Sequence, residues 1–533
     1  MVVPVLQKEQ RTVGNCLAHQ AALYPDREFL VFGERTWTYR EFDEWVTTVA
    51  GGLVALGLGK GDKLAIMLPN CAEFMAVWFA CARIGVIEVP VNAGYRGPLL
   101  RHILEHSDAR MAVVAAEFLE RFQHESVGYA KLEKLVVWSS APLPALELAI
   151  PAVPFDTLHT ESLPLPPVAI SHRDPMAIMY SSGTTGPSKG ILLCHNYFWW
   201  GGSSGARGRG VTGEDRLYTC LPLFHANAQL VTAMPALMAG ATLVIDDRFS
   251  ASNFWERLRE CRATQINYIG GMLPILMKQP PAAADRQHAV RLATGGGAPR
   301  ELWLQFEERF GVRIHEGYGQ TENCVALSNP LDATKVGSIG LPICGYDVDL
   351  VDDEDEPVGA GTVGELVFRP QHPHIMMDGY YKMPEATAAA SRNLWFHTGD
   401  LMKKDDDGYF YFVDRKKDAL RRRGENISAF EVEMVVNAHP AVLESAAIAV
   451  PADVGEDEVM VCVVLKPDQP LSALDLVRHC AELMPYFSVP RYVDFRSELP
   501  KTPTHRVEKY RLREQGVTPT TWDREQAGYK LQK

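Results

Sequence analysis

A segment rich in glycine and hydroxyl side chains, residues 180–190, is the part of the sequence that points most directly to chemistry. It reads Tyr-Ser-Ser-Gly-Thr-Thr-Gly-Pro-Ser-Lys-Gly and follows the apolar run Met176-Ala-Ile-Met. Glycines let backbone N–H groups approach an anion closely, and the hydroxyls and Lys189 add donors and positive charge. We interpret the segment as a phosphate-binding loop that follows a strand. Taken alone, such a cluster is equally compatible with an ordinary loop.

The spacing within this segment excludes the Walker P-loop of the P-loop NTPases. Counted from Gly183, the pattern GxxxxGK[ST] requires glycine at position 188 and serine or threonine at position 190. The chain has Ser188 and Gly190 at these positions. The phosphate-binding interpretation therefore needs another family of nucleotide enzymes.

Further short segments follow in a fixed order along the chain. They are Leu221-Pro-Leu-Phe-His225, Gly295-Gly-Gly-Ala-Pro299, Glu316-Gly-Tyr-Gly-Gln-Thr-Glu322, Trp395-Phe-His-Thr-Gly-Asp400, Val413-Asp-Arg-Lys-Lys-Asp418 and Arg423-Gly-Glu-Asn-Ile427. Together with residues 180–190, the set resembles the adenylate-forming superfamily of acyl-CoA synthetases, peptide-synthetase adenylation domains and luciferases. The resemblance begins near Pro25-Asp and Thr38-Tyr-Arg-Glu-Phe and spans almost the whole chain.

The resemblance implies a binding site for ATP and Mg²⁺. The residues implied at the β- and γ-phosphates are Ser181, Ser182, Gly183, Thr184, Thr185, Gly186 and Lys189. Those implied around the adenine are Gly295, Gly297, Ala298, Glu316, Gly317, Tyr318, Gly319, Gln320 and Thr321, with Tyr318 stacking on the base. Asp400 and Arg415 would hold the ribose, and Glu322 with Thr184 would hold Mg²⁺. Without the resemblance, the segment Gly317-Tyr-Gly would be interpreted as a turn, and Asp400 as a residue that caps a helix or a turn.

The resemblance also implies sites for an acyl group and for coenzyme A. His225 would be the gate between the acyl site and the thiol tunnel, although a lone histidine beside apolar residues is more often a core group. The acyl pocket would involve His225, Asn227, Tyr268, Gly271, Met272 and Gly295. Lys417 would be the hinge between domains, and Gly424 would line the pantetheine tunnel. Arg423, within the triplet 421–423, would bind CoA phosphates, unless this basic run is only a solvated turn.

The function that these matches imply is an ATP-dependent acid–CoA ligase. Such an enzyme converts a carboxylic acid to an acyl-adenylate with release of pyrophosphate, and a thiol then displaces AMP. Residues 221–299 most resemble the crotonobetaine/carnitine-CoA ligase group, which indicates a small or medium organic acid. Two alternatives stay open: transfer of the acyl group to an amine or carrier protein, and a catalytically weak binding relative.

One segment departs from the family pattern. The family usually has Pro-Lys-Thr-x-x-Gly-Lys near its C-terminus, whose last lysine reaches the carboxylate and the α-phosphate. This chain has Pro-Lys-Thr-Pro-Thr-His-Arg at residues 500–506. Arg506 thus takes the place of the lysine, with Lys501 and Lys509 as substitutes. Arginine keeps the charge but presents a planar fork in place of a compact ammonium group.

The elements that must position these residues alternate between strand and helix. Short aliphatic runs at residues 63–68, 111–115, 134–138, 241–245 and 265–269 predict strands, and residues 252–262 and 300–310 have helical spacing. Alternation of this kind predicts an α/β domain of mostly parallel sheets. From about residue 346, hairpin-like strands with acidic turns predict a β-rich subdomain. We expect a large N-terminal domain over residues 1–415.

The last part of the chain predicts a small α+β domain over residues 416–533, which the resemblance implies is mobile. Helices are expected near residues 429–437 and 471–484, and strands near residues 444–450 and 458–465. We place the boundary at residues 415–418.

The composition limits which classes of binding partner and which cellular locations we expect for this protein. The 533 residues are 47% apolar and 22% charged, and 53 basic against 66 acidic residues give a net charge of −13. A broad basic face for nucleic acid is not expected in such an acidic chain. Ten scattered cysteines favour reduced thiols, and we find no signal peptide and no stretch long enough for a transmembrane segment. We expect a cytoplasmic protein, and the resemblance implies that it can be a homodimer.

Overall fold

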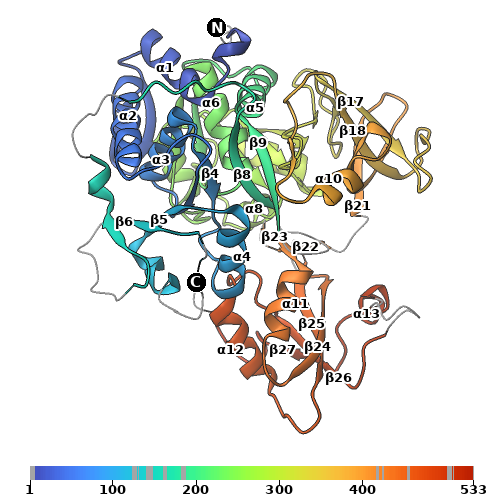
Figure 1. The fold of residues 1–533 in the computed structure, drawn as a ribbon. Coiled ribbons are helices and arrows are strands. Elements are labelled where there is room, and N and C mark those ends of the chain that lie inside the picture. The colour runs from blue at the N-terminus through green and yellow to red at the C-terminus, as the bar shows by residue number, and fades with distance from the viewer. Residues whose placement is uncertain are drawn as a thin grey trace. The chain divides into compact units, whose positions relative to one another are not determined.

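The computed structural model divides the chain into two compact units (Figure 1). The residues that it describes are 6–122, 129, 131–139, 148–159, 165–181, 188–415, 419–422, 425–452, 457–500, 507 and 509–531. The first unit comprises residues 1–93, 104–180 and 190–414, and the second comprises residues 94–103, 181–189 and 415–533.

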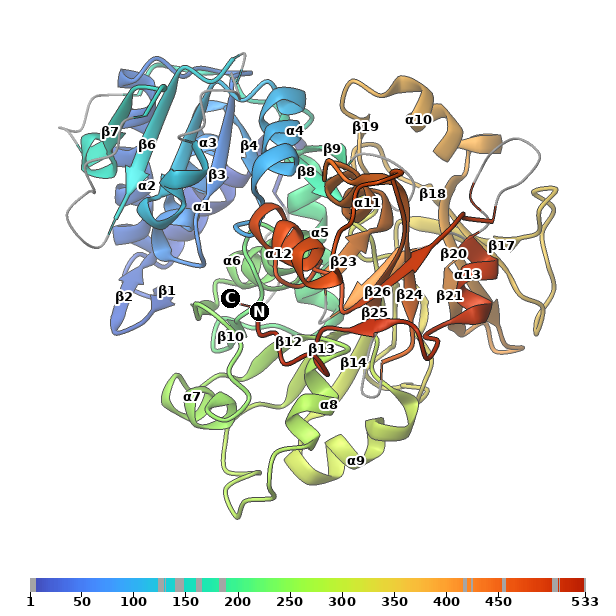
Figure 2. The same ribbon diagram turned by 90° about the horizontal axis from the view of Figure 1, so that it is seen from below.

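The first unit contains a sheet whose central strands are parallel. In spatial order the described strands are β16 (Leu341–Pro342), β15 (Leu327–Ser328), β14 (Arg313–Tyr318), β13 (Leu292–Gly296), β12 (Gln265–Ile269), β10 (Arg216–Thr219), β11 (Thr242–Ile245), β1 (Glu28–Phe32) and β2 (Arg35–Thr38). Strands β14 through β1 pair in parallel, and antiparallel pairs close both ends. Helices α8 (Met272–Met277) and α9 (Arg300–Phe310) lie beside β12 and β14 (Figure 2).

A second sheet of the same kind carries the strands that flank the glycine-rich segment. Its described strands, in order, are β19 (Gly379–Tyr380), β9 (Lys189–Cys194), β8 (Pro175–Ser181), β4 (Ile87–Pro90), β3 (Lys63–Met67), β5 (Met111–Ala115), β6 (Lys134–Trp138) and β7 (Ala152–Pro154). Strands β8 through β7 pair in parallel. Both sheets confirm the predicted α/β class.

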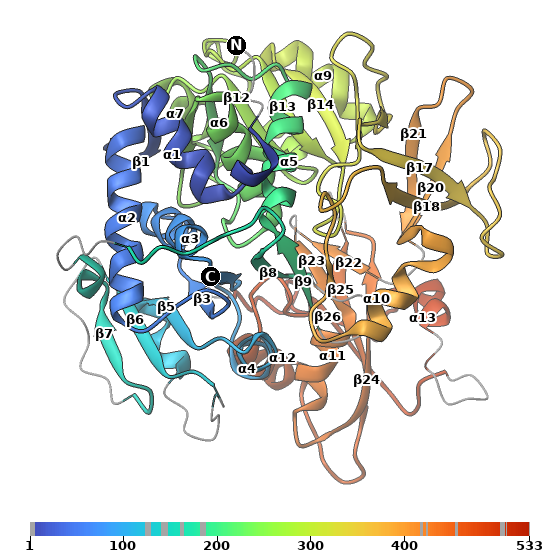
Figure 3. The same ribbon diagram turned by 45° about the horizontal axis from the view of Figure 1, so that its top comes forward.

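The remaining helices of the first unit surround and separate these sheets (Figure 3). They are α1 (Val13–Leu23), α2 (Tyr39–Ala55), α3 (Ala72–Ile84), α5 (His195–Gly208), α6 (Met234–Ala239), α7 (Phe254–Glu260) and α10 (Pro384–Ala390), while α4 (Gly97–Ser107) has residues in both units. The short 3₁₀ helices are η1 (Lys8–Gln10), η2 (Ala116–Phe122), η3 (Phe155–His159) and η5 (Arg392–Leu394), and η4 (Asn227–Ala233) is a π-helix.

Local sequence explains where two of these helices begin and end. Helix α2 begins with a capping box, in which the Thr38 hydroxyl accepts the Glu41 N–H and the Glu41 carboxylate accepts the Thr38 N–H. Helix α3 ends at Ile84 and is followed by Gly85, whose φ of 72° suits glycine. Because α3 contacts β1 of one sheet and β3 and β4 of the other, almost all of its side chains are buried. Residues 72–84 therefore form a core helix.

A third, antiparallel sheet forms the β-rich part of the first unit. Its strands are β17 (Tyr346–Val351), β18 (Gly364–Pro370), β20 (Phe396–Lys404) and β21 (Phe410–Arg415). The β17–β18 and β18–β20 pairs are antiparallel and enclose a small core that includes Leu350, Leu366 and Phe368. This sheet confirms the predicted hairpin region, and β20 carries Asp400.

The second unit is a small α+β structure. Its described elements are the hairpin β22 (Ala419–Arg422) and β23 (Glu425–Ser428), the sheet β24 (Val442–Val450), β25 (Glu458–Leu465), β26 (Tyr492–Arg496) and β27 (Trp522–Asp523), and helices α11 (Ala429–Asn437), α12 (Ala473–Leu483) and α13 (Lys509–Gln515). Apolar residues of α11, α12 and β25 form its core. In the part of the chain that is described, no helix has the length and apolar character needed to cross a membrane.

A buried histidine of the first unit makes its stability depend on pH. His195 is fully buried, and burial lowers its pKa to about 4. The unfolded chain protonates this imidazole near pH 6.5, so the unfolding free energy should fall as the pH drops from about 6.5 towards 4, by up to about 3 kcal/mol. Urea unfolding at about pH 7 and about pH 5 measures this loss. His195→Asn should show a weaker pH dependence over this window, and an equal dependence in both proteins would contradict the prediction.

Candidate nucleotide and acyl site

The phosphate-binding segment joins two neighbouring strands of the second sheet. Ser181 ends β8 and Lys189 begins β9. The expected phosphate ligands Ser182, Gly183, Thr184, Thr185 and Gly186 lie outside the described residues. A strand, and not a helix, follows Lys189, which agrees with the exclusion of the Walker P-loop.

Glu316 organises the turn that was expected to flank the adenine. It lies on β14, is only 5% exposed, and accepts hydrogen bonds from the Gly297 and Ala298 N–H groups and from the Tyr268 hydroxyl. Gly297 has a φ of +87°, which favours glycine. The carboxylate thus fixes the backbone between β13 and α9. The Glu316 carboxylate binds protein groups and stabilises the loop that was expected at the adenine.

The segment after β14 makes a tight turn that requires glycine at position 319. A Cβ there would lie 1.6 Å from the Cys324 carbonyl oxygen, so no larger residue fits without moving the backbone. Gly317 precedes this turn within β14, and Thr321 follows it, with its carbonyl accepting the Tyr197 hydroxyl at 2.7 Å. The shape of this turn therefore depends on local backbone contacts.

Asp400 is the point where two expected nucleotide-binding segments meet. It is 3% exposed and accepts the Tyr318 hydroxyl at 2.5 Å and the Gln320 amide Nε2 at 3.0 Å. Gln320 Nε2 also donates to the Thr398 carbonyl at 3.1 Å. Side chains about 80 residues apart in the sequence are thereby held at one place. The Arg415 backbone ends β21, and its side chain lies outside the description.

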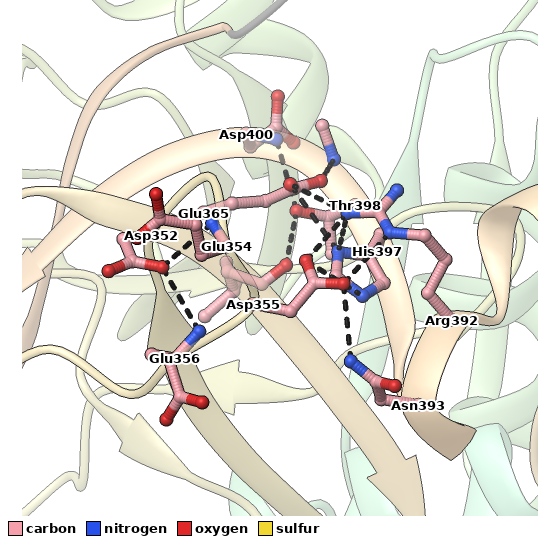
Figure 4. Close-up of polar contacts among 12 residues, drawn as sticks. Asp352, Glu354, Asp355, Glu356, Glu365, Arg392, Asn393, His397, Thr398 and Asp400 are labelled. Atoms are coloured by element: carbon pink, nitrogen blue, oxygen red, sulfur yellow. Dashed lines mark hydrogen bonds and ion pairs between the residues drawn. The ribbon is translucent and has the colours of Figure 1, made fainter.

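A charged network holds the turn that presents Asp400 (Figure 4). Glu365 on β18 accepts the Gly399 N–H at 3.0 Å, and the His397 ring lies 3.4 Å from the same carboxylate. Arg392 donates to both oxygens of Asp355, at 3.0 and 2.8 Å. Glu365 is 5% exposed. Sequence reasoning missed this network, and its only signal was an acidic residue within the apolar strand Gly364-Glu-Leu-Val-Phe.

We expect Glu365 to act as a positioning residue for Asp400. Glu365→Ala removes the acceptor of the Gly399 N–H, so the turn should move and the KM for ATP should rise about tenfold, with a smaller change in kcat. Steady-state kinetics with varied ATP measure this split. Glu365→Gln keeps an acceptor oxygen and should lie between the wild type and the alanine variant. An unchanged KM in folded Glu365→Ala would refute the role.

Glu322, the expected Mg²⁺ ligand, is held in place by neighbouring backbone and aromatic groups. Its side chain accepts the Tyr380 hydroxyl at 3.0 Å, its carbonyl accepts the Met377 N–H at 2.8 Å, and the residue is 9% exposed. Its carboxylate is a hard oxygen donor of the kind that Mg²⁺ prefers. The donor set therefore fits this cation, with Thr184 outside the described residues. Tyr380 is a further contact that the sequence did not reveal.

The expected acyl pocket gathers residues from three neighbouring elements. Asn227 begins the π-helix η4, and its Oδ1 accepts the Asn267 amide at 2.7 Å. Irregular π turns of this kind are frequent at functional sites. Gly295 has no room for a Cβ, which would lie 2.2 Å from the Tyr268 carbonyl oxygen.

The other expected pocket residues differ in exposure. His225 is half-buried, and its ring lies 4.6 Å from that of Phe224. Met272, at the start of α8, is buried, and Gly271 before it is half-buried. Tyr268 is fully buried, and its hydroxyl donates to Glu316. Its ring could therefore line the acyl pocket, but its hydroxyl is already bound to the protein.

A buried acid near the pocket escaped the sequence reasoning. Glu88 on β4 is fully buried, with Gln229 of η4 as its polar neighbour, and burial raises its pKa well above the usual range. Burial therefore favours the neutral form of this carboxyl group over the carboxylate. Its position in the strand Ile87-Glu-Val-Pro was the only signal.

The residues expected to contact CoA are mostly outside the described part of the chain. These are the hinge Lys417, Arg423 and Gly424, together with Arg506. Arg422, within the triplet expected at the CoA phosphates, requires a correction. It is 2% exposed, pairs with Glu458 at 2.7 Å and donates to the carbonyls of Phe487 and Val489. Arg422 is therefore a core residue of the second unit and not a phosphate ligand.

Comparisons with known proteins agree with this arrangement. The profile of the family described as "AMP-binding enzyme" matches residues 17–381, and that of the "AMP-binding enzyme C-terminal domain" matches residues 431–506. A crotonobetaine/carnitine–CoA ligase of Salmonella agona (strain SL483) is 32% identical over 502 residues, which cover 92% of this chain and 97% of that protein.

Two solved structures with high coverage are similar to the whole chain. An o-succinylbenzoate CoA synthetase from Bacillus subtilis, bound with a product analogue, has a TM-score of 0.80 and 25% identity, covering 94% of this chain and 98% of that one. An anthranilate CoA ligase in complex with anthranoyl-AMP has a TM-score of 0.72 and 27% identity, covering 97% and 99%. Both likenesses extend over the two units.

Proposed function

Because the chain belongs to the AMP-binding enzyme family, we propose that it is an ATP-dependent acid–CoA ligase with two half-reactions. In the first, an oxygen of the substrate carboxylate attacks the α-phosphorus of ATP, and pyrophosphate leaves. In the second, the CoA sulfur attacks the acyl carbonyl carbon, the C–O bond to AMP breaks, and the thiol proton is released. The products are acyl-CoA, AMP and pyrophosphate.

The observation that carries this proposal is the convergence of Tyr318 and Gln320 on Asp400. A buried carboxylate held by two donors suits the cis hydroxyls of a ribose, and the turn that Glu316 fixes suits the edge of an adenine. Because these side chains are already fixed by protein contacts, they can orient the nucleotide without rearrangement, which favours in-line attack on the α-phosphorus.

Glu322 would hold Mg²⁺ together with Thr184, and Ser181–Lys189 would hold the phosphates. When bound, Mg²⁺ neutralises the phosphate oxygens that gain charge during displacement. Tyr380 donates to one oxygen of Glu322 and so limits the orientations of its carboxylate. Lys189, at the first position of β9, contributes a cation at the end of a strand.

The second half-reaction would use residues of the C-terminal region, which we propose moves about Lys417. Gly424 and Arg423 would then face the pantetheine arm and phosphates of CoA, and His225 would open the way from the acyl pocket to the thiol.

Arg506 would guide the carboxylate to the α-phosphate in the first half-reaction. Arg506→Ala should therefore reduce ATP–pyrophosphate exchange, with Arg506→Lys retaining more of it.

The proposed substrate is a small or medium organic acid. The relatives at 32% identity are named for crotonobetaine and carnitine, and solved relatives are named for o-succinylbenzoate and anthranilate, all compact acids. Burial favours the neutral form of Glu88, which would therefore offer little countercharge to a cationic headgroup. The ten thiols are free, which supports a reducing cytoplasmic setting. Assembly as a homodimer is part of the same proposal.

An acid panel tests this function. The enzyme is incubated with ATP, Mg²⁺ and acids that differ in length, ring content and charge, with and without CoA. Acid-dependent pyrophosphate release, with thioester formed only when CoA is present, is the expected result. If amides form when amines are added, the acyl acceptor is an amine and not CoA. No reaction with any acid of the panel would indicate a catalytically weak relative.

A further inference from the structure

A cluster of three side chains that could bind a metal ion lies in the first unit, and none of the three was expected at the nucleotide. Cys194, His374 and Asp378 each bring one potential ligand atom, and these atoms all lie within 4.8 Å of one another. Cys194 ends β9 just before α5, while the other two residues belong to the loop that precedes β19 (Figure 2). Residues about 180 positions apart in the sequence are thus brought together.

We propose that Cys194, His374 and Asp378 bind one divalent transition-metal ion of the zinc class. A thiolate, an imidazole and a carboxylate form a borderline-soft ligand set that suits Zn²⁺ or Co²⁺ and not Mg²⁺. The site is therefore chemically distinct from the oxygen site expected at Glu322.

One distance between two ligand atoms fits this coordination, and all three atoms lie within 4.8 Å of one another. In tetrahedral zinc sites, bonds of about 2.0–2.3 Å place ligand atoms about 3.3–3.8 Å apart. The His374 Nδ1 and Asp378 Oδ1 atoms are 3.4 Å apart, which is long for a charged hydrogen bond but suits the edge of a coordination tetrahedron. The Cys194 Sγ lies 3.6 Å from the His374 carbonyl oxygen, so the thiol faces this loop. Small side-chain movements would complete the geometry.

The backbone around the cluster is fixed by contacts that come from three segments. The Asn196 amide donates to the His374 carbonyl at 3.0 Å, and the Asn196 N–H donates to the His172 carbonyl at 2.7 Å. The Asp378 N–H donates to the Leu192 carbonyl at 2.9 Å. His374 has a φ of +63°, a conformation that non-glycine residues seldom adopt. The hydrogen bonds to this loop therefore stabilise a backbone conformation at His374 that is unfavourable by itself.

A second imidazole, that of His172, lies next to the three proposed ligands. The His172 and His374 rings are 5.8 Å apart between centroids and perpendicular. Among the described residues, His172 Nε2 is a buried atom with no hydrogen-bond partner, and such atoms in native proteins call for an unseen ligand or water. His172 and water are the two candidates for the fourth position of the ion.

The ion would have an entry path and a structural consequence. The His374 and Asp378 side chains are about one-third exposed, and Asp378 also borders a groove of about 480 Å³. Two residues beyond Asp378, Tyr380 donates to Glu322. Metal binding would thus brace the segment that orients Glu322. This consequence depends on the proposed function, whereas the binding itself does not.

Cobalt and zinc binding to untagged protein tests the proposal. After chelation and dialysis, the full chain should bind one Zn²⁺, and Co²⁺ should give the near-ultraviolet charge-transfer absorption of a thiolate ligand. Cys194→Ser should abolish that absorption, and both Cys194→Ser and Asp378→Asn should weaken zinc binding at least tenfold. The matched controls are Cys344→Ser, which removes the exposed thiol, and His372→Ala in the same loop; both should bind like the wild type.

Several results would overturn the proposal. These are binding without a charge-transfer band, equal zinc affinity in the wild type and Cys194→Ser, or loss of the band in Cys344→Ser. Asp378 is partly exposed, so Asp378→Asn should fold even if Cys194→Ser does not, and far-ultraviolet circular dichroism checks both. Zinc binding requires neither ATP nor an acid, so its failure would leave the proposed ligase activity untouched.

Discussion

Glu322→Gln should lower the rate of acid-dependent pyrophosphate release at least 100-fold, which corresponds to about 2.7 kcal/mol. The amide keeps the size of the side chain and an oxygen that accepts the Tyr380 hydroxyl, but it loses the charge that a Mg²⁺ ligand requires. The rate is measured at saturating ATP and acid over a range of Mg²⁺ concentrations. Raising Mg²⁺ should recover only a small part of the loss.

Tyr380→Phe is the matched control for this prediction. It removes the 3.0 Å hydrogen bond to Glu322 and leaves the carboxylate in place. We therefore expect a loss of roughly tenfold or less, together with a higher Mg²⁺ requirement. A rate for Glu322→Gln within about threefold of the wild type, or a greater loss in Tyr380→Phe, would remove Glu322 from the metal site.

Arg422→Ala should destabilise the second unit by about 3–5 kcal/mol. The substitution leaves Glu458 buried without its cation and takes the guanidinium away from the carbonyls of Phe487 and Val489. Hydrogen exchange of the β25 amides measures the stability of this unit. An Arg422→Ala protein that stays stable but loses affinity for CoA would restore the phosphate-binding role that the burial of this residue excludes.

Arg478→Ala provides the control within the same unit. Arg478 pairs with Asp475 on α12, and both side chains are more than half exposed. Surface pairs of this kind contribute about 0–1 kcal/mol. The difference between the two arginine variants therefore separates a buried ion pair from a solvated one.

Much of the fold follows from local sequence patterns. Helix α11 and strand β25 begin and end where the sequence predicted, because one has a helical apolar face and the other a continuous apolar run. The π-helix η4 was not predictable, since a single extra residue per turn leaves no trace in the apolar spacing.

The supporting contacts of the site were harder to predict than its motifs. Glu316 and Asp400 stand in recognisable segments, but Glu365 supports Asp400 from another strand, and Tyr380 reaches Glu322 from 58 residues away. Arg422 stands in a basic run that resembles a surface, yet it is buried because Glu458 lies opposite. Such pairings depend on tertiary packing, and short sequence motifs do not encode them.

The most direct test of the central claim follows an oxygen atom. An acid that proves to be a substrate is labelled with heavy oxygen in its carboxylate and allowed to react with ATP and CoA. If the carboxylate attacks the α-phosphorus, each turnover that yields acyl-CoA also yields AMP with one labelled phosphate oxygen. Label in inorganic phosphate, with ADP in place of AMP, or unlabelled AMP beside labelled thioester would contradict the acyl-adenylate mechanism.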